Sequence, residues 1–344
     1  MDNIFCTLFD SNYLDKGLVL YRSMEMHLKD FKLYIFAFDD KCAEILKKEN
    51  LKNAIVVSLN EFETDALKKV KTERTAAEYC WTCTPWTIKY VLEKYNENIC
   101  TYIDADMMFF SSPQYVFDDM RDNDCSIIIV PHRFGSEKKE EKAKNTIGTY
   151  CVEFNTFVKD KNGMAALNWW AEKCLEWCFY ALPGTTEWYG DQKYLNEFPK
   201  KFSGVYICNH YGLGMAPWNV SILESTDTGF NPPYVRKKGG SDAYPVILYH
   251  YANAEFLTRH ILQVPFSMKS KKMRKAICDS YVEKLFEERA YLLHKYRILL
   301  PRTKRVLTNN KALYLYKRYL YPLKILLKGL PKGMKGFYWI KENS

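Results

Sequence analysis

Two carboxylates separate two apolar runs in the stretch Cys100-Thr101-Tyr102-Ile103-Asp104-Ala105-Asp106-Met107-Met108-Phe109-Phe110. The first run predicts a buried strand that ends at the acids. Two carboxylates held this close repel each other unless a cation or a proton lies between them. Mg²⁺ and Mn²⁺ prefer such oxygen ligands and often bridge to substrate phosphates. The stretch therefore predicts a divalent-metal site at the end of a strand.

A second pair of aspartates has the same spacing, in Asp122-Asn123-Asp124. This pair lies in a charged segment, residues 118–124, with no apolar run leading into it. We expect it to be solvated. Spacing alone is therefore a weak signal, and the flanking apolar runs are what distinguish Asp104 and Asp106.

The overall composition is that of a globular protein. The 344 residues are 47% hydrophobic and 26% charged, which suits one large domain or two. The chain does not open with the basic start, apolar core and cleavage site of a signal peptide. No apolar run approaches the roughly 18 residues that cross a bilayer. We therefore expect the protein in the cytoplasm.

The positive charge is concentrated at the C-terminal end. Residues 261–344 contain 20 Lys and Arg against 5 Asp and Glu, whereas the preceding 260 residues contain 30 against 36. Within this region, residues 314–328 interleave aromatic, aliphatic and basic side chains, a composition that suits an anionic membrane surface. A basic helix packed on the main body is the alternative. Nucleic acid ranks third, because no recognition motif is present.

The first sixty residues alternate between strand and helix patterns. They predict strands over residues 3–9, 33–38 and 54–59, and helices over 14–28 and 41–48. This alternation predicts an α/β fold with a mostly parallel sheet and helices on both faces. We expect one Rossmann-like catalytic domain over residues 1–260. A basic, helical extension over residues 261–344 should follow it.

Acidic residues follow several of the predicted strands, namely Asp10, Asp39, Asp104 and Asp106. Ligands of such sheets bind beyond the carboxyl ends of the strands. A lone Asp at this position is usually a helix cap. The recurrence at several strand ends nevertheless favours one shared pocket.

The middle of the chain adds further elements. Strands are predicted over 126–131 and 150–158, and a last strand over 244–251. Pro85 suits the first turn of a helix, which we expect to run through Tyr95. Aromatic residues at helical spacing predict another helix over 162–180.

Three polar residues on or near these elements could bind a ligand or could serve the fold. Arg74 is either a phosphate ligand or a surface ion pair. Asn155, inside an apolar strand, is either a satisfied core amide or a ligand contact. His250, near the end of the last strand, is either structural or a ligand of Mn²⁺.

Four segments in this order resemble nucleotide-sugar transferases of the GT-A fold, and most closely glycosyltransferase family 8 and related bacterial surface-polysaccharide enzymes. The segments are the first strand with its turn from Thr7 to Tyr13, Tyr102-Ile103-Asp104-Ala105-Asp106, Glu153-Phe154-Asn155, and Gly190-Asp191-Gln192-Lys193-Tyr194-Leu195-Asn196. The resemblance spans about residues 1–255. It departs from the family at Phe157, where the family often has Gly, and around His250, where the family's phosphate-binding Lys is missing.

The resemblance implies a role for each matching residue. Asp104 and Asp106 would hold Mn²⁺ or Mg²⁺ against the donor diphosphate, with His250 as the third ligand. Nucleotide contacts would come from Thr7, Asp10, Tyr13 and Asp39. Asn155, Asp191 and Gln192 would face the donor sugar and the reaction. Arg74 or Lys193 could substitute for the missing phosphate-binding Lys.

The resemblance also implies the reaction. A hexose would pass from a UDP-sugar to a glycan or lipid-linked acceptor of surface polysaccharide or lipopolysaccharide synthesis, with retention of configuration. A rival is a haloacid-dehalogenase-like phosphatase with Asp104 as nucleophile and Asp106 as acid. Met107 and Met108 replace the small residues expected there, and the motif follows three predicted strands rather than lying on the first. A membrane-surface scaffold would leave the strand-end acids unexplained.

Overall fold

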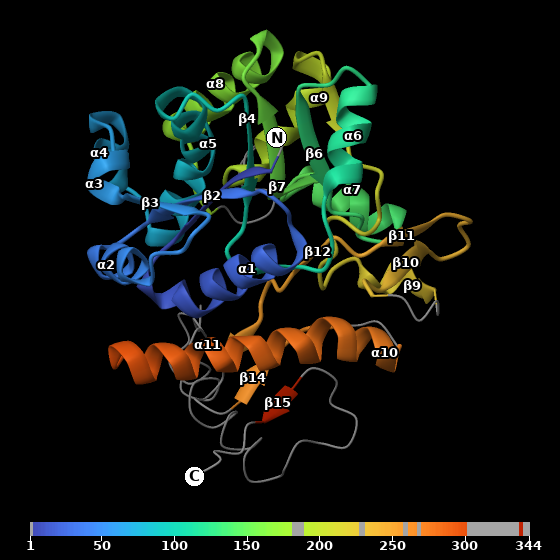
Figure 1. The fold of residues 1–344 in the computed structure, drawn as a ribbon. Coiled ribbons are helices and arrows are strands. Elements are labelled where there is room, and N and C mark those ends of the chain that lie inside the picture. Colours follow the sequence, from blue (N-terminus) through green and yellow to red (C-terminus); the bar gives the residue numbers. More distant parts are fainter. Residues whose placement is uncertain are drawn as a thin grey trace, which may run out of the picture. The chain divides into compact units, whose positions relative to one another are not determined.

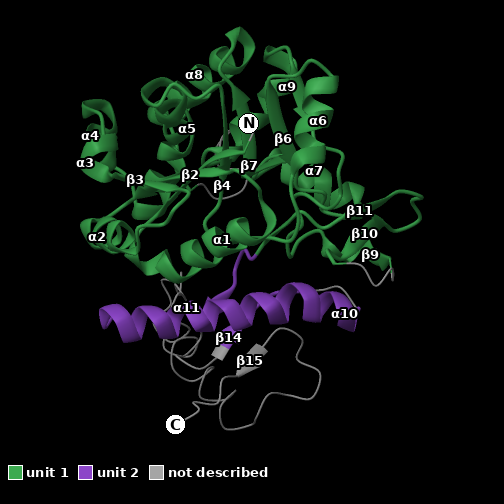
Figure 2. Cartoon of the chain, in the orientation of Figure 1, with its two compact units in different colours: residues 1–250 green, residues 251–344 purple. Residues whose placement is uncertain are grey.

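The computed structural model describes residues 3–180, 189–226, 231–256, 261–266, 270–300 and 337–339. The chain divides into two compact units, unit 1 (residues 1–250) and unit 2 (residues 251–344), coloured separately in Figure 2. Residues 314–328, on which the membrane prediction rests, lie outside the described part.

The core of unit 1 is a seven-stranded sheet (Figure 1). In spatial order its strands are β3 (Ala54–Ser58), β2 (Lys32–Ala37), β1 (Ile4–Phe9), β4 (Ile99–Ile103), β7 (Tyr150–Val158), β6 (Ile127–Pro131) and β8 (Val205–Ile207). Neighbours from β3 to β4 run parallel, and so do β6 and β8, while β7 is antiparallel to both of its neighbours. The predicted mostly parallel α/β sheet is confirmed.

Helices cover both faces of this sheet, as Figure 1 shows. Side chains of a strand alternate between faces, so Cys6 and Phe9 of β1 point to opposite sides. Cys6 Sγ lies 3.6 Å from Thr87 of α5 (Ala76–Lys94), whereas the Phe9 ring packs against Gly17 of α1 (Leu14–His27). The two helices therefore enclose the sheet between them.

Unit 1 contains further helices and strands. The helices are α2 (Asp40–Glu49), α3 (Leu59–Phe62), α4 (Asp65–Lys71), α6 (Gln114–Asp122), α7 (Glu137–Asn145), α8 (Lys161–Glu176) and α9 (Phe198–Lys201), with 3₁₀ turns at Ser11–Tyr13, Gln192–Glu197 and Val220–Ile222. The strands are β5 (Met107–Phe109), β9 (Leu223–Thr226), β10 (Tyr234–Lys237), β11 (Ala243–Pro245) and β12 (Leu248–His250).

The prediction that Pro85 begins a helix is wrong. Helix α5 begins at Ala76, where Thr75 and Glu78 form a capping box in which each side chain bonds the backbone N–H of the other residue. Pro85 lies inside the helix and cannot donate the backbone hydrogen bond expected at its position. The cap satisfies the Glu78 N–H of the first turn and the N–H of Thr75 before it, which favours a helix start at Ala76.

The predicted last strand over residues 244–251 is divided in two. Strand β11 pairs with β10 in a three-stranded sheet, whereas β12 pairs antiparallel with β5. Pro245, the last residue of β11, has no N–H with which to continue the ladder. The pairing of β12 places His250 opposite Met107, directly after the two predicted metal-binding acids.

Unit 2 contains both helix and strand. Helix α10 (Lys271–Met273) continues through a π-helical turn, Arg274–Asp279, into α11 (Ser280–Tyr296). Strands β13 (Glu255–Phe256), β14 (Ile261–Gln263) and β15 (Phe337–Trp339) form an antiparallel sheet. The Tyr251 ring stacks on Tyr281 at 3.5 Å between centroids. A search of the described residues finds no helix both long and apolar enough to cross a bilayer.

Helix α8 depends on a glycine at its first turn. The backbone N–H of Gly163 bonds the capping carboxylate of Asp160, and a Cβ at this position would lie 2.1 Å from the Val158 carbonyl oxygen. The helix carries Trp170, which is fully buried. We predict that Gly163→Ala lowers the free energy of unfolding by about 1–3 kcal/mol, because the backbone must shift to make room.

Urea unfolding followed by circular dichroism measures this change. Ala165→Ser, on the exposed side of the same helix, is the control and should change the free energy of unfolding by less than about 0.5 kcal/mol. Equal stability of the two variants would contradict the close contact at Gly163.

Candidate metal and nucleotide-sugar site

Asp104 and Asp106 follow β4 directly, as the apolar run before them predicted. The Tyr102 hydroxyl donates a hydrogen bond of 2.9 Å to Asp104 Oδ1 and orients this carboxylate. The control pair, Asp122 and Asp124, is exposed at the end of α6 and just after it, as expected.

His250 lies between Asp104 and Asp106 on one side and a third carboxylate, Glu153, on the other. Its Nε2 is 3.1 Å from Asp106 Oδ1 and 3.7 Å from Asp104 Oδ2, while its Nδ1 is 2.8 Å from Glu153 Oε2. One ligand atom from each of Asp104, Asp106 and His250 lies within 4.8 Å of the others. Two carboxylate oxygens and one imidazole nitrogen at this spacing suit Mn²⁺ or Mg²⁺. Metal binding by these three residues stays a prediction.

Glu153 is a residue whose part in the site the sequence analysis did not assign. It is fully buried on β7, and its Oε1 has no hydrogen-bond partner within the described part of the chain. A carboxylate accepts the Nδ1–H of a metal-binding His and so turns Nε2 toward the metal. Cys151, two residues earlier, faces the same side and forms a second, softer group of possible ligands with Glu153 and His250.

The protonation of these groups follows from burial and neighbouring charge. Burial raises the pKa of Asp104 to about 7, and the charge of Asp106 adds to this effect. Burial acts on Asp106 in the same way, but His250 and Lys16 outweigh it and hold the pKa of Asp106 well below its usual range. Burial would lower the pKa of His250, yet Asp106, Cys151 and Glu153 raise it well above its ordinary value. Without a metal, a protonated imidazole is thus the cation between these acids.

Lys16 is a further residue that the sequence analysis missed. It lies in the first turn of α1, is buried, and places Nζ 3.7 Å from Asp106 Oδ2 and 4.1 Å from the centre of the Tyr13 ring. Burial would lower its pKa, but Asp106 and neighbouring groups raise it, so the side chain is charged. A lone Lys at a helix start is ordinarily solvated, and so the sequence pattern did not single it out.

Asp191 joins the same group of charges from the loop after α8. The Trp170 indole N–H donates to the Asp191 carbonyl oxygen at 2.9 Å, which anchors the backbone here. Burial and the charge of Asp104 raise the pKa of the Asp191 carboxyl to about 7. We call Asp104, Asp106, Glu153 and Asp191 the acid cluster.

Asn155 and Thr7, two of the predicted ligand contacts, are buried polar side chains with unused hydrogen-bonding atoms. The side-chain oxygen and nitrogen of Asn155 and the hydroxyl of Thr7 have no hydrogen-bond partner within the described residues. Buried polar groups are normally paired, so each of these side chains is a candidate for a ligand contact. Gln192 is held differently, because its side-chain amide donates to the Ile147 carbonyl oxygen at 2.8 Å.

Asp10, Asp39 and Tyr13 lie around the turn that follows β1. Asp10 caps this turn by accepting the Asn12 N–H, and Asp39 caps α2 by accepting the Cys42 N–H. Asp39 also accepts the Ser11 N–H at 2.9 Å, which ties the two strand ends together. Both acids therefore have structural partners, as a lone strand-end Asp often does. Their contacts with a nucleotide stay predictions.

Arg74 and Lys193 are both bonded to the protein. The Arg74 guanidinium donates to the Thr82 hydroxyl and to the Leu175 carbonyl oxygen, each at 2.7 Å, and links α5 to α8. Lys193 Nζ donates to the Asn145 carbonyl oxygen at 3.0 Å. These bonds hold both side chains against the protein, and Arg74 Nε is buried without a hydrogen-bond partner among the described residues. Their role as phosphate ligands stays a prediction.

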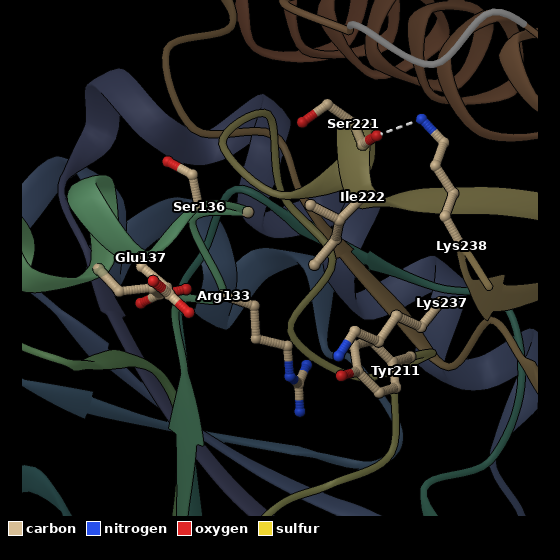
Figure 3. Close-up of a pocket in the computed structure, with 10 residues that line it drawn as sticks. Arg133, Ser136, Glu137, Tyr211, Ser221, Ile222, Lys237 and Lys238 are labelled. Atoms are coloured by element: carbon tan, nitrogen blue, oxygen red, sulfur yellow. Dashed lines mark hydrogen bonds between the residues drawn. The ribbon is translucent and has the colours of Figure 1, made fainter. Parts of the chain in front are cut away.

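A separate cavity of about 770 Å³ opens beside α7 and β10, and none of the predicted site residues lines it. Figure 3 shows Glu137 on one side of this cavity and Tyr211 and Lys237 on the other. Arg133 lies 4.9 Å from the centre of the Tyr211 ring. The converging ligand atoms, and not this cavity, mark the candidate active site.

The fold is that of the GT-A class of nucleotide-sugar transferases. A crystal structure of the galactosyltransferase LgtC with donor and acceptor sugar analogues matches 83% of this chain and 95% of LgtC, with a TM-score of 0.51 and 13% sequence identity. At this identity the likeness establishes the fold alone. The rival expectation of a haloacid-dehalogenase-like fold, with the acids after the first strand, is wrong: they follow β4 in the middle of a GT-A sheet.

The chain belongs to the same family as YfnF of Bacillus subtilis (strain 168), with 30% identity over 260 residues, 73% of this chain and 82% of YfnF. A second protein of that organism, YfnD, is 27% identical over 258 residues, 74% of this chain and 78% of YfnD. No protein-family model matches the chain. Both relatives are described as uncharacterised, so the family membership assigns no activity.

The raised pKa of Asp191 leads to a prediction about stability. A carboxyl whose pKa is higher in the folded than in the unfolded state favours folding at low pH, and this contribution is lost as the pH rises to about 7. In metal-free protein, Asp191→Asn should therefore raise the free energy of unfolding at pH 8 by about 1–3 kcal/mol. The gain should shrink at pH 5, where the wild-type carboxyl is protonated.

Denaturant unfolding in EDTA at both pH values tests this expectation. Asp122→Asn, at the exposed end of α6, makes the same chemical change and should alter stability by less than about 0.5 kcal/mol at either pH. An Asp191→Asn variant that is less stable than wild type at pH 8 would show that the carboxylate is satisfied in the folded protein.

Proposed function

We propose that this protein is a metal-dependent glycosyltransferase that moves a hexose from a UDP-sugar to a glycan or lipid-linked acceptor of surface-polysaccharide synthesis. The observation that carries the proposal is the convergence of Asp104, Asp106 and His250 beyond the carboxyl end of β4 in a GT-A sheet. The likeness in fold to LgtC, described as a galactosyltransferase, supports the same class of reaction.

Each residue of the site has a proposed task. Asp104, Asp106 and His250 would hold Mn²⁺ or Mg²⁺, with Glu153 fixing the imidazole through Nδ1. The bound cation would supply Lewis-acid stabilisation for the departing diphosphate. Thr7 and Tyr13, beside the turn after β1, would contact the nucleotide.

The donor sugar would lie beside Asp104 and Asp191, next to Asn155 of β7. The Asn155 amide has no hydrogen-bond partner among the described residues, and Asp191 and Gln192 lie at the start of the 3₁₀ turn that follows α8. A sugar that leaves a diphosphate becomes oxocarbenium-like, so a neighbouring carboxylate such as Asp191 stabilises positive charge at the reacting carbon. We propose retention of configuration, with Asp191 and Gln192 beside the reacting face.

A donor panel tests the proposal. Purified protein is incubated with UDP- and GDP-sugars, with and without Mn²⁺, and the released nucleoside diphosphate is measured. Release should require Mn²⁺ and should fall about 100-fold or more in Asp106→Ala, because a metal ligand is lost.

The matched control is Asp122→Ala, which removes an exposed aspartate of the same local spacing and should keep wild-type activity. Activity that is independent of metal, or equal in the two variants, contradicts the proposed role of Asp106. Release of phosphate from monoesters in place of nucleoside diphosphate would contradict the reaction class.

We further propose that the C-terminal tail binds the anionic cytoplasmic surface of a membrane. In the full-length chain, replacing four basic tail residues by Gln should abolish sedimentation with phosphatidylserine vesicles, since each basic residue contributes about 1 kcal/mol. The residues are Lys317, Arg318, Lys324 and Lys328.

The control replaces four exposed lysines of unit 1 by Gln and should keep vesicle binding. They are Lys41, Lys47, Lys48 and Lys52. Sedimentation that persists in the tail variant, or that is lost equally in both, contradicts membrane binding by the tail.

A further inference from the structure

Lys16 is the basic side chain in contact with the predicted metal-binding acids. In the described part of the chain, no other Lys or Arg lies within 4.0 Å of a carboxylate of the acid cluster. Lys16 comes from the first turn of α1, directly after the turn where Tyr13 and Asp10 lie. It therefore stands between the predicted metal ligands and the predicted nucleotide contacts.

The contact between Lys16 and Asp106 leaves room for another partner. The distance from Nζ to Oδ2 is 3.7 Å, longer than the 2.7–3.2 Å of an ordinary N–H···O hydrogen bond. An ammonium carries three donors, of which the Tyr13 side chain uses one, and the charge of Asp15 adds to that of Asp106 in stabilising the cation. The remaining donors are not all used by these partners. A buried cation with incompletely used donors is suited to an incoming anion.

The two other candidate cations are less available. Arg74 makes two hydrogen bonds of 2.7 Å that link α5 and α8, and Lys193 donates to a backbone carbonyl oxygen. Moving either side chain to a phosphate would disturb contacts that support the fold, and the one Arg74 donor without a partner among the described residues, Nε, is buried. Lys16 would only have to replace its 3.7 Å contact with Asp106 by a hydrogen bond to a phosphate oxygen.

We propose that Lys16 is the side chain that neutralises the diphosphate of the nucleotide donor, in place of Arg74 or Lys193. This inference rests on the proposed glycosyltransferase function. A diphosphate held at Asp104 and Asp106 through a divalent cation would be close to Asp106, whose carboxylate lies 3.7 Å from Lys16 Nζ.

The charge of Lys16 acts on the leaving group. When the bond between the sugar C1 and the β-phosphate oxygen breaks, its electron pair stays on that oxygen, and the diphosphate gains negative charge. C1 forms its new bond to the acceptor hydroxyl oxygen, whose proton passes to water. The Lys16 ammonium stabilises the leaving diphosphate electrostatically and keeps its own protons.

The proposal predicts opposite effects on two ligands. Removing a positive charge beside Asp106 should strengthen binding of Mn²⁺ alone, because like charges repel. The same change should weaken binding of a nucleoside diphosphate, because the cation that faces it is lost. A purely structural Lys16, needed only to position Asp106, would instead weaken both.

The experiment uses the full-length chain with Lys16→Met, Lys16→Gln and Lys16→Arg. Binding of Mn²⁺ alone is titrated by electron paramagnetic resonance, and binding of UDP, GDP and uridine with saturating Mn²⁺ by calorimetry. For Lys16→Met and Lys16→Gln we expect Mn²⁺ to bind about 2- to 10-fold more tightly and the diphosphate about 10- to 100-fold more weakly, with uridine unchanged. Lys16→Arg should lose less affinity for the diphosphate than Lys16→Met, because it keeps the charge, even though the larger guanidinium has to fit a buried position.

Lys47→Met, on the exposed side of α2, is the matched control for loss of one lysine. Arg74→Met and Lys193→Met compare the rival cations. The inference is overturned if Lys16→Met and Lys16→Gln lose affinity for Mn²⁺, if they keep wild-type affinity for the diphosphate, or if Arg74→Met or Lys193→Met alone shows the selective loss. If wild-type protein binds neither UDP nor GDP, the proposed function itself fails, and the inference fails with it.

Discussion

The antiparallel pairing of β5 with β12 determines where the site forms. Strand β5 continues from the two acids at the end of β4, and β12 ends at His250, so their register sets the imidazole beside the carboxylates. The backbone N–H of His250 also bonds the Met215 carbonyl oxygen at 2.8 Å, which holds the end of β12 from its other side. A shift of one residue in this pairing would turn His250 to the opposite face. The geometry of the site therefore depends on a contact between segments far apart in the chain.

The same geometry brings the negative charges of the acid cluster close together. Four carboxylates converge at one edge of the sheet, and only Lys16 and His250 offset them directly in the described residues. The pKa values of Asp104 and Asp191 are raised to about 7, while that of Asp106 is lowered. Because only the pKa of Asp106 is lowered, His250 and Lys16 stabilise the charged carboxylate of Asp106 more than those of Asp104 and Asp191. A divalent cation would relieve the remaining repulsion, which links metal binding to the stability of unit 1.

Local patterns predicted the parts of the fold that local interactions determine. The alternation of strands and helices from β1 to β3 follows from apolar periodicity, and it was predicted to within one or two residues. Helix α5 begins well before Pro85, because the capping pair Thr75 and Glu78 fixes its start and the helix accommodates the proline in its interior. The partners of His250 could not be derived from its neighbours in sequence, and only the family resemblance implied them. Lys16 and Glu153 were missed as site residues because a single charged residue in an element does not reveal what lies across from it.

The crowding of carboxylates also bears on how this family can diverge. Asp104 and Asp191 are held in the folded protein where burial disfavours their charged forms, so the fold alone gains nothing by keeping them. Random substitution tends to replace such residues by neutral ones unless selection acts on something other than stability. If these aspartates serve the proposed reaction, a descendant gene that no longer needs the reaction should lose them early and retain Gly163, Trp170 and the sheet core. The order in which these positions change would then distinguish family members that keep the proposed activity from members that have lost it.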